Sequence, residues 1–176
     1  MSPTIRPATL SDIPAVTRIY AHAVETGTAS FELTPPDQAE MTRRMNALLD
    51  GGFPYLAAEV DGAVAGYAYA GAYRPRPAYR FTLEDSVYIA PEAQGRGIGS
   101  ALLPALVEES AARGFRQMIA VIGDSEQAAS IALHARAGFY YVGTQPNTGF
   151  KFGRWLDTVL MQRPLGSGST TAPEDH

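Results

Sequence analysis

The segment Gln94-Gly95-Arg96-Gly97-Ile98-Gly99-Ser100-Ala101 combines small residues in a pattern that can bind an anion. It lies between an expected strand, residues 86–89, and an expected helix that begins near Gly99 and carries apolar residues at helical spacing. At such a helix N-terminus, free backbone amides and the positive end of the helix dipole converge, and glycines let a diphosphate approach the backbone closely. The pattern therefore predicts a diphosphate site, with a ligand-free strand-to-helix turn as the alternative.

Two common nucleotide motifs do not fit this loop, because no Gly-Lys-Ser/Thr follows and Ser100 stands where the dinucleotide fingerprint needs its third glycine. The loop does resemble the Gln/Arg-x-x-Gly-x-Gly/Ala signature of the GNAT superfamily of N-acetyltransferases. The resemblance implies that the loop holds the pyrophosphate of acetyl-CoA. It also implies that the preceding strand is bulged and splays from its neighbour, so that its backbone pairs with the pantetheine amides. The implied coenzyme contacts are Val87, Tyr88, Ile89, Gln94, Gly95, Arg96, Gly97, Ile98, Gly99, Ser100, Ala101, Gln127 and Ser130.

Three further segments narrow the resemblance to one branch of that superfamily. The phosphinothricin and methionine sulfone acetyltransferases have segments similar to Thr82-Leu83-Glu84-Asp85-Ser86-Val87-Tyr88-Ile89, Leu133-His134 and Gly149-Phe150-Lys151-Phe152-Gly153-Arg154-Trp155-Leu156-Asp157. The resemblance implies an acetyl-CoA-dependent enzyme that acetylates a small amino-acid-like amine and works as a homodimer. We assign a structural or dimer-contact role to Lys151, Arg154, Trp155 and Asp157.

The expected reaction needs a deprotonated amine, a stabilised oxyanion and a proton for the departing thiolate. The resemblance assigns Glu84 as the base and places His134, a side chain suited to proton transfer near neutral pH, where many members carry a proton-donating tyrosine. Asp85 is the rival base, but alternation along a strand puts Glu84 and Asp85 on opposite faces, so that one of them faces the cleft. Gln127 stands where the superfamily commonly has an asparagine that contacts the coenzyme.

The acceptor is expected to meet an arginine pair and two aromatic rings. Arg74 and Arg76 stand two apart in an extended, proline-rich stretch, and together they can address a carboxylate or phosphinate. Phe31 and Tyr79 are candidates for the apolar part of the pocket. Surface solvation for the arginines and core packing for the rings are the alternatives.

The elements that position these residues follow from periodicity and turn signals. Helices are expected at about residues 12–25, capped by Ser11, and from the Thr34-Pro35-Pro36 start to about residue 49. A hairpin turns at Asp61-Gly62, and later strands at 81–89 and 118–122 alternate with helices. This order predicts an α/β (α+β) fold of the GNAT type, a mixed, mostly antiparallel sheet flanked by helices. We expect one domain over residues 1–165 and a disordered tail over 166–176.

Composition excludes several other functions. The chain has 176 residues, no cysteine and a formal charge of −4, so thiol chemistry and nucleic-acid binding are not expected. No long apolar run or secretory signal is visible, which favours a cytoplasmic protein without a membrane partner, and the isolated His22 and His176 predict no metal site. Two other functions stay open: acetylation of a polyamine, aminoglycoside or peptide N-terminus, and a non-catalytic acetyl-CoA sensor.

Overall fold

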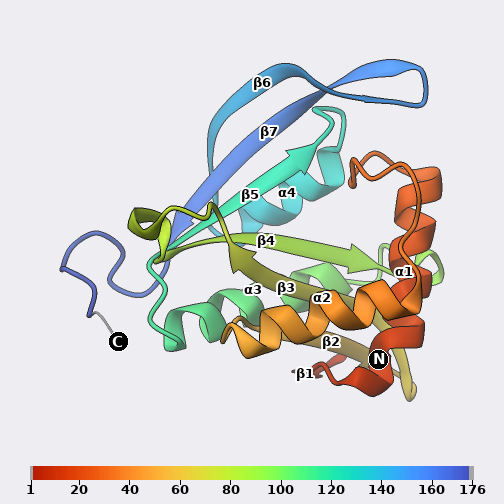
Figure 1. Ribbon diagram of the computed structural model, residues 1–176, viewed down its shortest axis with the longest axis horizontal. Helices are drawn as coiled ribbons and strands as arrows, with labels where there is room; N and C mark the ends of the chain where they lie inside the picture. Colours follow the sequence, from red (N-terminus) through yellow and green to blue (C-terminus); the bar gives the residue numbers. More distant parts are fainter. Residues whose placement is uncertain (1, 175–176) are drawn as a thin grey trace.

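The computed structural model describes residues 2–174, and in this part of the chain seven strands form one mixed sheet (Figure 1). The strand order is β1-β2-β3-β4-β5-β7-β6, in which β4 and β5 are parallel and all other neighbours are antiparallel. The fold class predicted from the sequence is confirmed. The strands are β1 (Thr4–Pro7), β2 (Tyr55–Val60), β3 (Ala63–Ala72), β4 (Thr82–Ile89), β5 (Gln117–Gly123), β6 (Tyr140–Lys151) and β7 (Arg154–Pro164).

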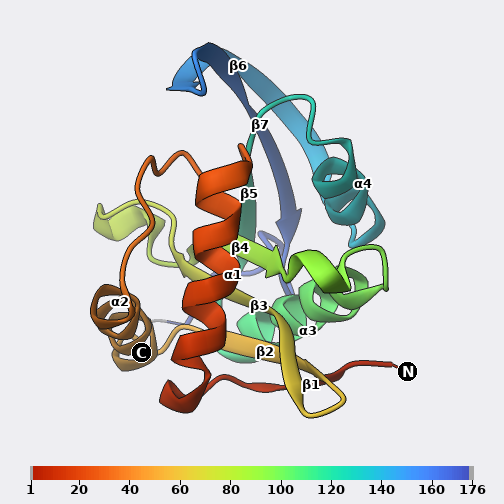
Figure 2. The same cartoon turned by 90° about the vertical axis from the view of Figure 1, so that its right-hand side faces the viewer.

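Helices cover both faces of the sheet (Figure 2). The first face carries α1 (Ile13–Thr26) and α2 (Gln38–Asp50), and the second carries α3 (Ile98–Ala112) and α4 (Ala128–Arg136). Leu102, Leu103 and Leu106 of α3 are fully buried, as their helical spacing predicts, and they fix the start of this helix against the sheet. No helix in the described part of the chain is long and apolar enough to span a membrane.

The two parallel strands at the centre of the sheet separate along their length (Figure 1). β4 pairs with β5 only at Thr82, Leu83 and Glu84. Beyond Glu84 the strands diverge, whereas β4 stays paired with β3 in one continuous register as far as Ile89. The predicted splay is therefore confirmed. The bulge expected in the same strand is not seen against β3, because separation from β5 alone frees one side of β4.

The predicted N-caps of the first two helices are wrong, by one residue and by three. Asp12, not Ser11, is the N-cap of α1, and its carboxylate accepts a hydrogen bond from the amide of Thr9 at 2.8 Å. Asp37, not Thr34, caps α2 and accepts from the amide of Glu40 at 2.8 Å. Both stretches contain several residues able to cap, and local sequence does not rank them.

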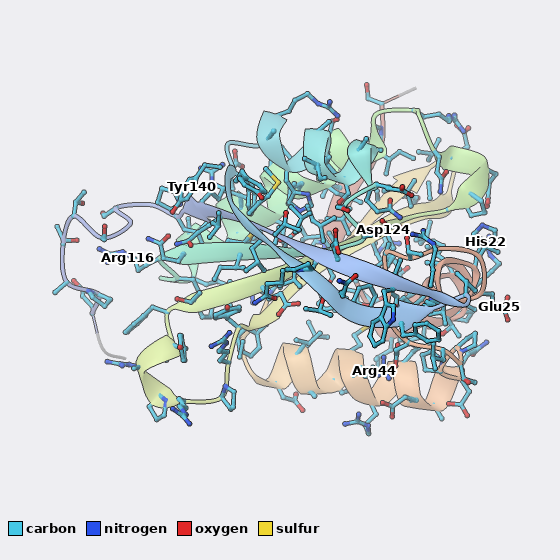
Figure 3. All side chains as sticks on the ribbon, turned by 90° about the horizontal axis from the view of Figure 1, so that it is seen from above. His22, Glu25, Arg44, Arg116, Asp124 and Tyr140 are labelled. Atoms are coloured by element: carbon cyan, nitrogen blue, oxygen red, sulfur yellow. The ribbon has the colours of Figure 1, made fainter. Side chains whose placement is uncertain are left out.

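The segment that follows β7 packs at the end of the sheet where β4 and β5 are paired. The side chain of Leu165 is fully buried, and the guanidinium of Arg116 donates to the carbonyl oxygens of Gly168 and Thr171 at 2.9 and 2.7 Å. Figure 3 shows Arg116 beside this segment. The expected disorder of residues 166–176 stays a prediction, and residues 175–176, including His176, lie outside the described residues.

Candidate active site

A cavity of about 60 Å³ occupies the gap between the diverging ends of β4 and β5. Its walls come from both strands, from the start of the loop after α1 and from α4, so the splay of the sheet and the helix beneath it form one pocket. Two of its charged or titratable side chains, Asp85 and His134, are buried. The lining residues are Ala29, Asp85, Ser86, Val87, Tyr88, Ala120, Val121, Ile122, Gly123, Gln127, Ser130 and His134.

The glycine loop follows β4 and ends at the N-terminus of α3. Gly95 and Gly97 have φ values of +72° and +77°, a left-handed conformation that glycine adopts without strain, and Gly97 is the N-cap of the helix. Residues 94–97 are exposed, and a methyl group added at Gly95 or Gly97 would meet no protein atom within 4 Å. The amides of the first helical turn therefore face open space, which fits a bound diphosphate.

Gly99 and Ile98 have a different role in this segment. A Cβ atom at Gly99 would lie 3.1 Å from Cδ2 of Leu133, so the missing side chain lets α3 approach α4 closely. Ile98 is 2% exposed and belongs to the core. Gly99 therefore packs the start of α3 against the helix that carries His134, and Ile98 packs into the core beside Gly66 of β3.

Glu84 and Asp85 project from opposite faces of β4. Glu84 lies opposite Gly71 of β3, on the same face as the neighbouring pair of Ser86 and Tyr69. This face is the one covered by α1 and α2. Burial, together with the nearby charge of Asp85, raises the pKa of the half-buried Glu84 above its ordinary value.

Asp85 faces α4 and binds His134 directly. Its Oδ2 lies 2.8 Å from Nε2 of His134, and Nδ1 of the same ring lies 2.7 Å from the carbonyl oxygen of Ser130. Burial lowers the pKa of His134, but the hydrogen bond and charge of Asp85 and the Ser130 carbonyl outweigh it, so that the pKa is raised overall. Sequence reasoning treated Asp85 only as a rival base and missed this pair, because the two residues are 49 positions apart.

The loop between α1 and α2 packs against β5 and β6. The ring of Phe31 lies against Gly123 at the end of β5 and Gly149 of β6, where added Cβ atoms would collide with it. Lys151 is only 3% exposed, and its Nζ donates to the carbonyl oxygen of Ser30 at 2.8 Å. Lys151 thus has a structural role and is not available for a dimer contact. Phe31 borders the pocket through Gly123 but is not among its lining residues.

Asp124, directly after β5, ties this loop to α4 and β7 (Figure 3). Its carboxylate accepts hydrogen bonds from the hydroxyl of Thr28 and the guanidinium of Arg154, both at 2.8 Å. The amide side chain of Gln127 donates to the same Thr28 hydroxyl at 3.0 Å. Gln127 therefore lines the pocket with its side-chain amide already bonded within the protein, and Arg154 is held in a structural ion pair.

The structure places Arg74, Arg76 and Tyr79 outside the pocket, in the loop between β3 and β4. The guanidinium of Arg74 stacks over the rings of Tyr73 and Tyr79, at 4.9 and 5.6 Å from their centroids. Both arginines are exposed, and neither has a carboxylate partner within residues 2–174. β4 begins two residues before Glu84, so that the positive charges of the loop and the predicted base lie at the same end of β4.

Known proteins resemble the chain over nearly its whole length. The acetyltransferase (GNAT) family matches residues 16–139. A phosphinothricin N-acetyltransferase of Alcaligenes faecalis is 58% identical over 97% of this chain and 87% of the relative. An L-methionine sulfoximine/L-methionine sulfone acetyltransferase of Pseudomonas aeruginosa is 43% identical over 94% of this chain and 96% of the relative.

The fold is also very similar to the folds of solved acetyltransferase structures. A phosphinothricin acetyltransferase from Sinorhizobium meliloti, solved in complex with acetyl-CoA, superposes with a TM-score of 0.96 at 52% identity, covering 99% of this chain and 95% of that one. An acetyltransferase from Salmonella typhimurium, solved with acetyl-CoA, gives a TM-score of 0.93 at 39% identity, covering 99% of both chains. The chain belongs to the GNAT family of acetyltransferases, in the branch that contains the phosphinothricin and methionine sulfoximine enzymes.

Proposed function

We propose that this protein transfers the acetyl group of acetyl-CoA to the amine of a small amino acid of the phosphinothricin, methionine sulfone or methionine sulfoximine type. The observation that carries the proposal is the pocket between β4 and β5, together with the exposed glycine loop that follows β4 and caps α3, a helix packed on the α4 wall of that pocket. A thioester with a diphosphate-bearing tail can lie across both features. The 58% identity to a phosphinothricin N-acetyltransferase supports the acceptor class.

In the proposed reaction, the base and the acid lie on opposite faces of β4. Glu84, on the face covered by α1 and α2, accepts a proton from the acceptor ammonium, directly or through water. Its raised pKa keeps it a better proton acceptor than an exposed glutamate. His134, on the face covered by α4, supplies the proton for the sulfur of the departing coenzyme. Acetyl-CoA brings the activated acyl group, so no acyl-enzyme is needed.

The coenzyme contacts predicted from the sequence remain part of this proposal. Val87 and Tyr88 line the pocket on the side of β4 that β5 leaves unpaired, which suits backbone pairing with an extended chain. Residues 94–101 supply the helix N-terminus, to which Arg96 adds an exposed positive charge. Gln127 and Ser130 lie on the α4 wall of the pocket.

We also propose that the protein acts as a homodimer. Large apolar side chains are exposed together on β6 and β7, with Tyr141 at 61% and Trp155 at 63% exposure. The ring of Trp155 packs edge-on against the exposed ring of Phe150, so the two form one apolar surface. Sedimentation velocity of the parent and of Trp155→Lys tests this: a parent dimer that the variant dissociates supports the interface, and a monomeric parent overturns it.

Release of free thiol from acetyl-CoA tests the function itself. Phosphinothricin, methionine sulfone and methionine sulfoximine should each give acetylation with saturation kinetics. Polyamines, aminoglycosides and peptide N-termini form the comparison set. Preference for one of these over the amino acids would overturn the acceptor assignment. Acetyl-CoA binding without turnover on any amine would instead identify a sensor.

A further inference from the structure

Both nitrogens of His134 are engaged in the folded protein, which determines where its protons are. The carbonyl oxygen of Ser130 only accepts hydrogen bonds, so Nδ1 carries a hydrogen and donates it at 2.7 Å. The 2.8 Å contact between Nε2 and Oδ2 of Asp85 requires one further proton between them. Asp85 and His134 together therefore hold one proton more than a neutral imidazole and a free carboxylate would.

We propose that Asp85 is a positioning residue that keeps His134 protonated and makes Nε2 the single nitrogen able to release a proton in the reaction. This assignment rests on the proposed function, and it gives Asp85 a role that neither strand alternation nor the family resemblance assigned. Nδ1 donates a hydrogen bond to the Ser130 carbonyl oxygen of α4, the helix that carries His134, so this proton stays bound within the helix. Nε2 shares its proton with a carboxylate that lines the same pocket.

Within residues 2–174, no other charged group contacts His134. α4 offers the ring only the Ser130 carbonyl, and the end of that helix offers the edge of Phe139, whose ring centroid lies 5.0 Å from that of His134. β4 presents Asp85, and the β5 wall of the pocket consists of Ala120, Val121, Ile122 and Gly123. Tyr88 is the other titratable lining residue, and burial raises its pKa, so it stays neutral. Glu84 lies on the far face of β4.

The second carboxylate oxygen of Asp85, Oδ1, does not take part in the contact with His134. Its side chain is 1% exposed, and Oδ1 has no hydrogen-bond partner among the described residues. A buried carboxylate oxygen without a partner is costly, so a proton-bearing group in the pocket is expected to satisfy it during turnover.

The proton balance of the step is simple. As the carbon–sulfur bond of the tetrahedral intermediate breaks, the proton shared between Nε2 of His134 and Oδ2 of Asp85 passes to the sulfur. A neutral imidazole with the Nε2 lone pair facing a carboxylate is left. This arrangement is unfavourable, and a proton lost by the acceptor nitrogen restores it. One proton leaves the pair and one returns in each turnover.

Histidine NMR of the free protein tests the proposal without any substrate. The chain has three histidines, and His134→Phe identifies the His134 signal. In the parent, ¹⁵N shifts should show both His134 nitrogens protonated at pH 7, and its titration midpoint should lie above the ordinary histidine value of about 6.5. A neutral His134 at pH 7 in the parent overturns the proposal.

Asp85→Asn removes the charge but keeps a side chain of the same shape. The His134 midpoint should fall below the ordinary histidine value of about 6.5, because burial then acts without the carboxylate. The value of kcat at pH 8 should fall by about 10- to 100-fold with an unchanged KM for acetyl-CoA. The alkaline limb of the rate profile should move to lower pH, because the variant loses the protonated form earlier. An unchanged midpoint or an unchanged alkaline limb contradicts the proposal. Should this variant not fold, Asp85→Ser gives the same readouts.

Asp12→Asn is the matched control. Asp12 is also a buried aspartate with a cationic partner, Arg6 at 2.8 Å, but it lies at the start of α1. This variant should lose stability and leave the His134 titration unchanged. The NMR readouts do not depend on turnover, so an inactive parent would refute the proposed function while the state of His134 is still measured.

Discussion

Glu84 and Asp85 are consecutive in sequence but serve opposite faces of β4. The carboxylate of Asp85 binds His134 of α4 at 2.8 Å, and that of Glu84 projects toward the face covered by α1 and α2. The splay beyond Glu84 is the place where both faces meet, because β5 no longer closes that side of the strand. A base and an acid can therefore act on one acetyl group from two sides.

Glu84→Gln should lower kcat by about 10²- to 10⁴-fold, the usual contribution of a general base. The carboxylate must be charged to accept a proton, and activity is lost as pH falls through the pKa of Glu84. Because that pKa is raised, the acid limb should lie at a higher pH than an exposed glutamate would give. The variant should flatten this limb and bind acetyl-CoA as the parent does.

The stability of the same variant provides a second readout. A raised carboxyl pKa means that folding disfavours the charged form, so this group contributes more stability as pH falls through its folded pKa. Glu84→Gln should therefore raise the thermal midpoint at pH 8. Glu108→Gln, at an exposed position on α3, should change neither kcat nor the acid limb. A fully active Glu84→Gln enzyme would show that the base is elsewhere.

Gly97→Ala should weaken acetyl-CoA binding at least tenfold, because a methyl group would project beside the amides expected to bind the diphosphate. Gly62, in the turn between β2 and β3, is a matched control: it has the same φ of +77° and no protein atom within 4 Å of an added Cβ. Both substitutions should cost about 1 kcal/mol of stability from the left-handed conformation. Calorimetry that finds equal affinities for the two variants would place the diphosphate elsewhere.

Gly149→Ala should displace Phe31, whose ring occupies the space of the added methyl group. We expect a several-fold rise in KM for the acceptor, an unchanged KM for acetyl-CoA and a loss of about 1–3 kcal/mol of stability from overpacking. Gly143→Ala, also in β6, adds its methyl group to open space and should be silent. An unchanged acceptor KM in a folded Gly149→Ala protein would remove Phe31 from the acceptor pocket.

Local signals in the sequence predicted the helices and strands, the glycine turn before α3 and the placement of Glu84 and Asp85 on opposite faces of one strand. Periodicity placed α3 and its buried leucines, the glycine spacing placed the turn at its start, and strand alternation separated Glu84 from Asp85. These features depend on residues close in sequence. Lys151 and Ser30 are 121 residues apart, and Asp85 and His134 are 49 apart. Only the tertiary fold brings such partners together, so neither pair was predicted.

The arginine pair was predicted as an anion site, and its environment in the structure favours that role. Arg74 is held over two tyrosine rings, which restricts its side chain, and both guanidinium groups lack a carboxylate partner within residues 2–174. Positive charges left unpaired beside the start of β4 are available to an acceptor carboxylate or phosphinate.

Arg74→Ala and Arg76→Ala should therefore each raise KM for amino-acid acceptors by about 10- to 100-fold, the range expected when a charge-assisted contact to an anion is lost. The double variant should no longer distinguish an amino acid from its decarboxylated amine, because the group that differs between them would have no cationic partner. KM for acetyl-CoA should not change, since residues 94–101 lie at the other end of β4. Arg43→Ala is the control, because Arg43 is an exposed arginine of α2 paired with Glu40. If the parent enzyme prefers decarboxylated amines, the arginine pair does not bind the acceptor, and the cationic acceptors of the comparison set become the better candidates.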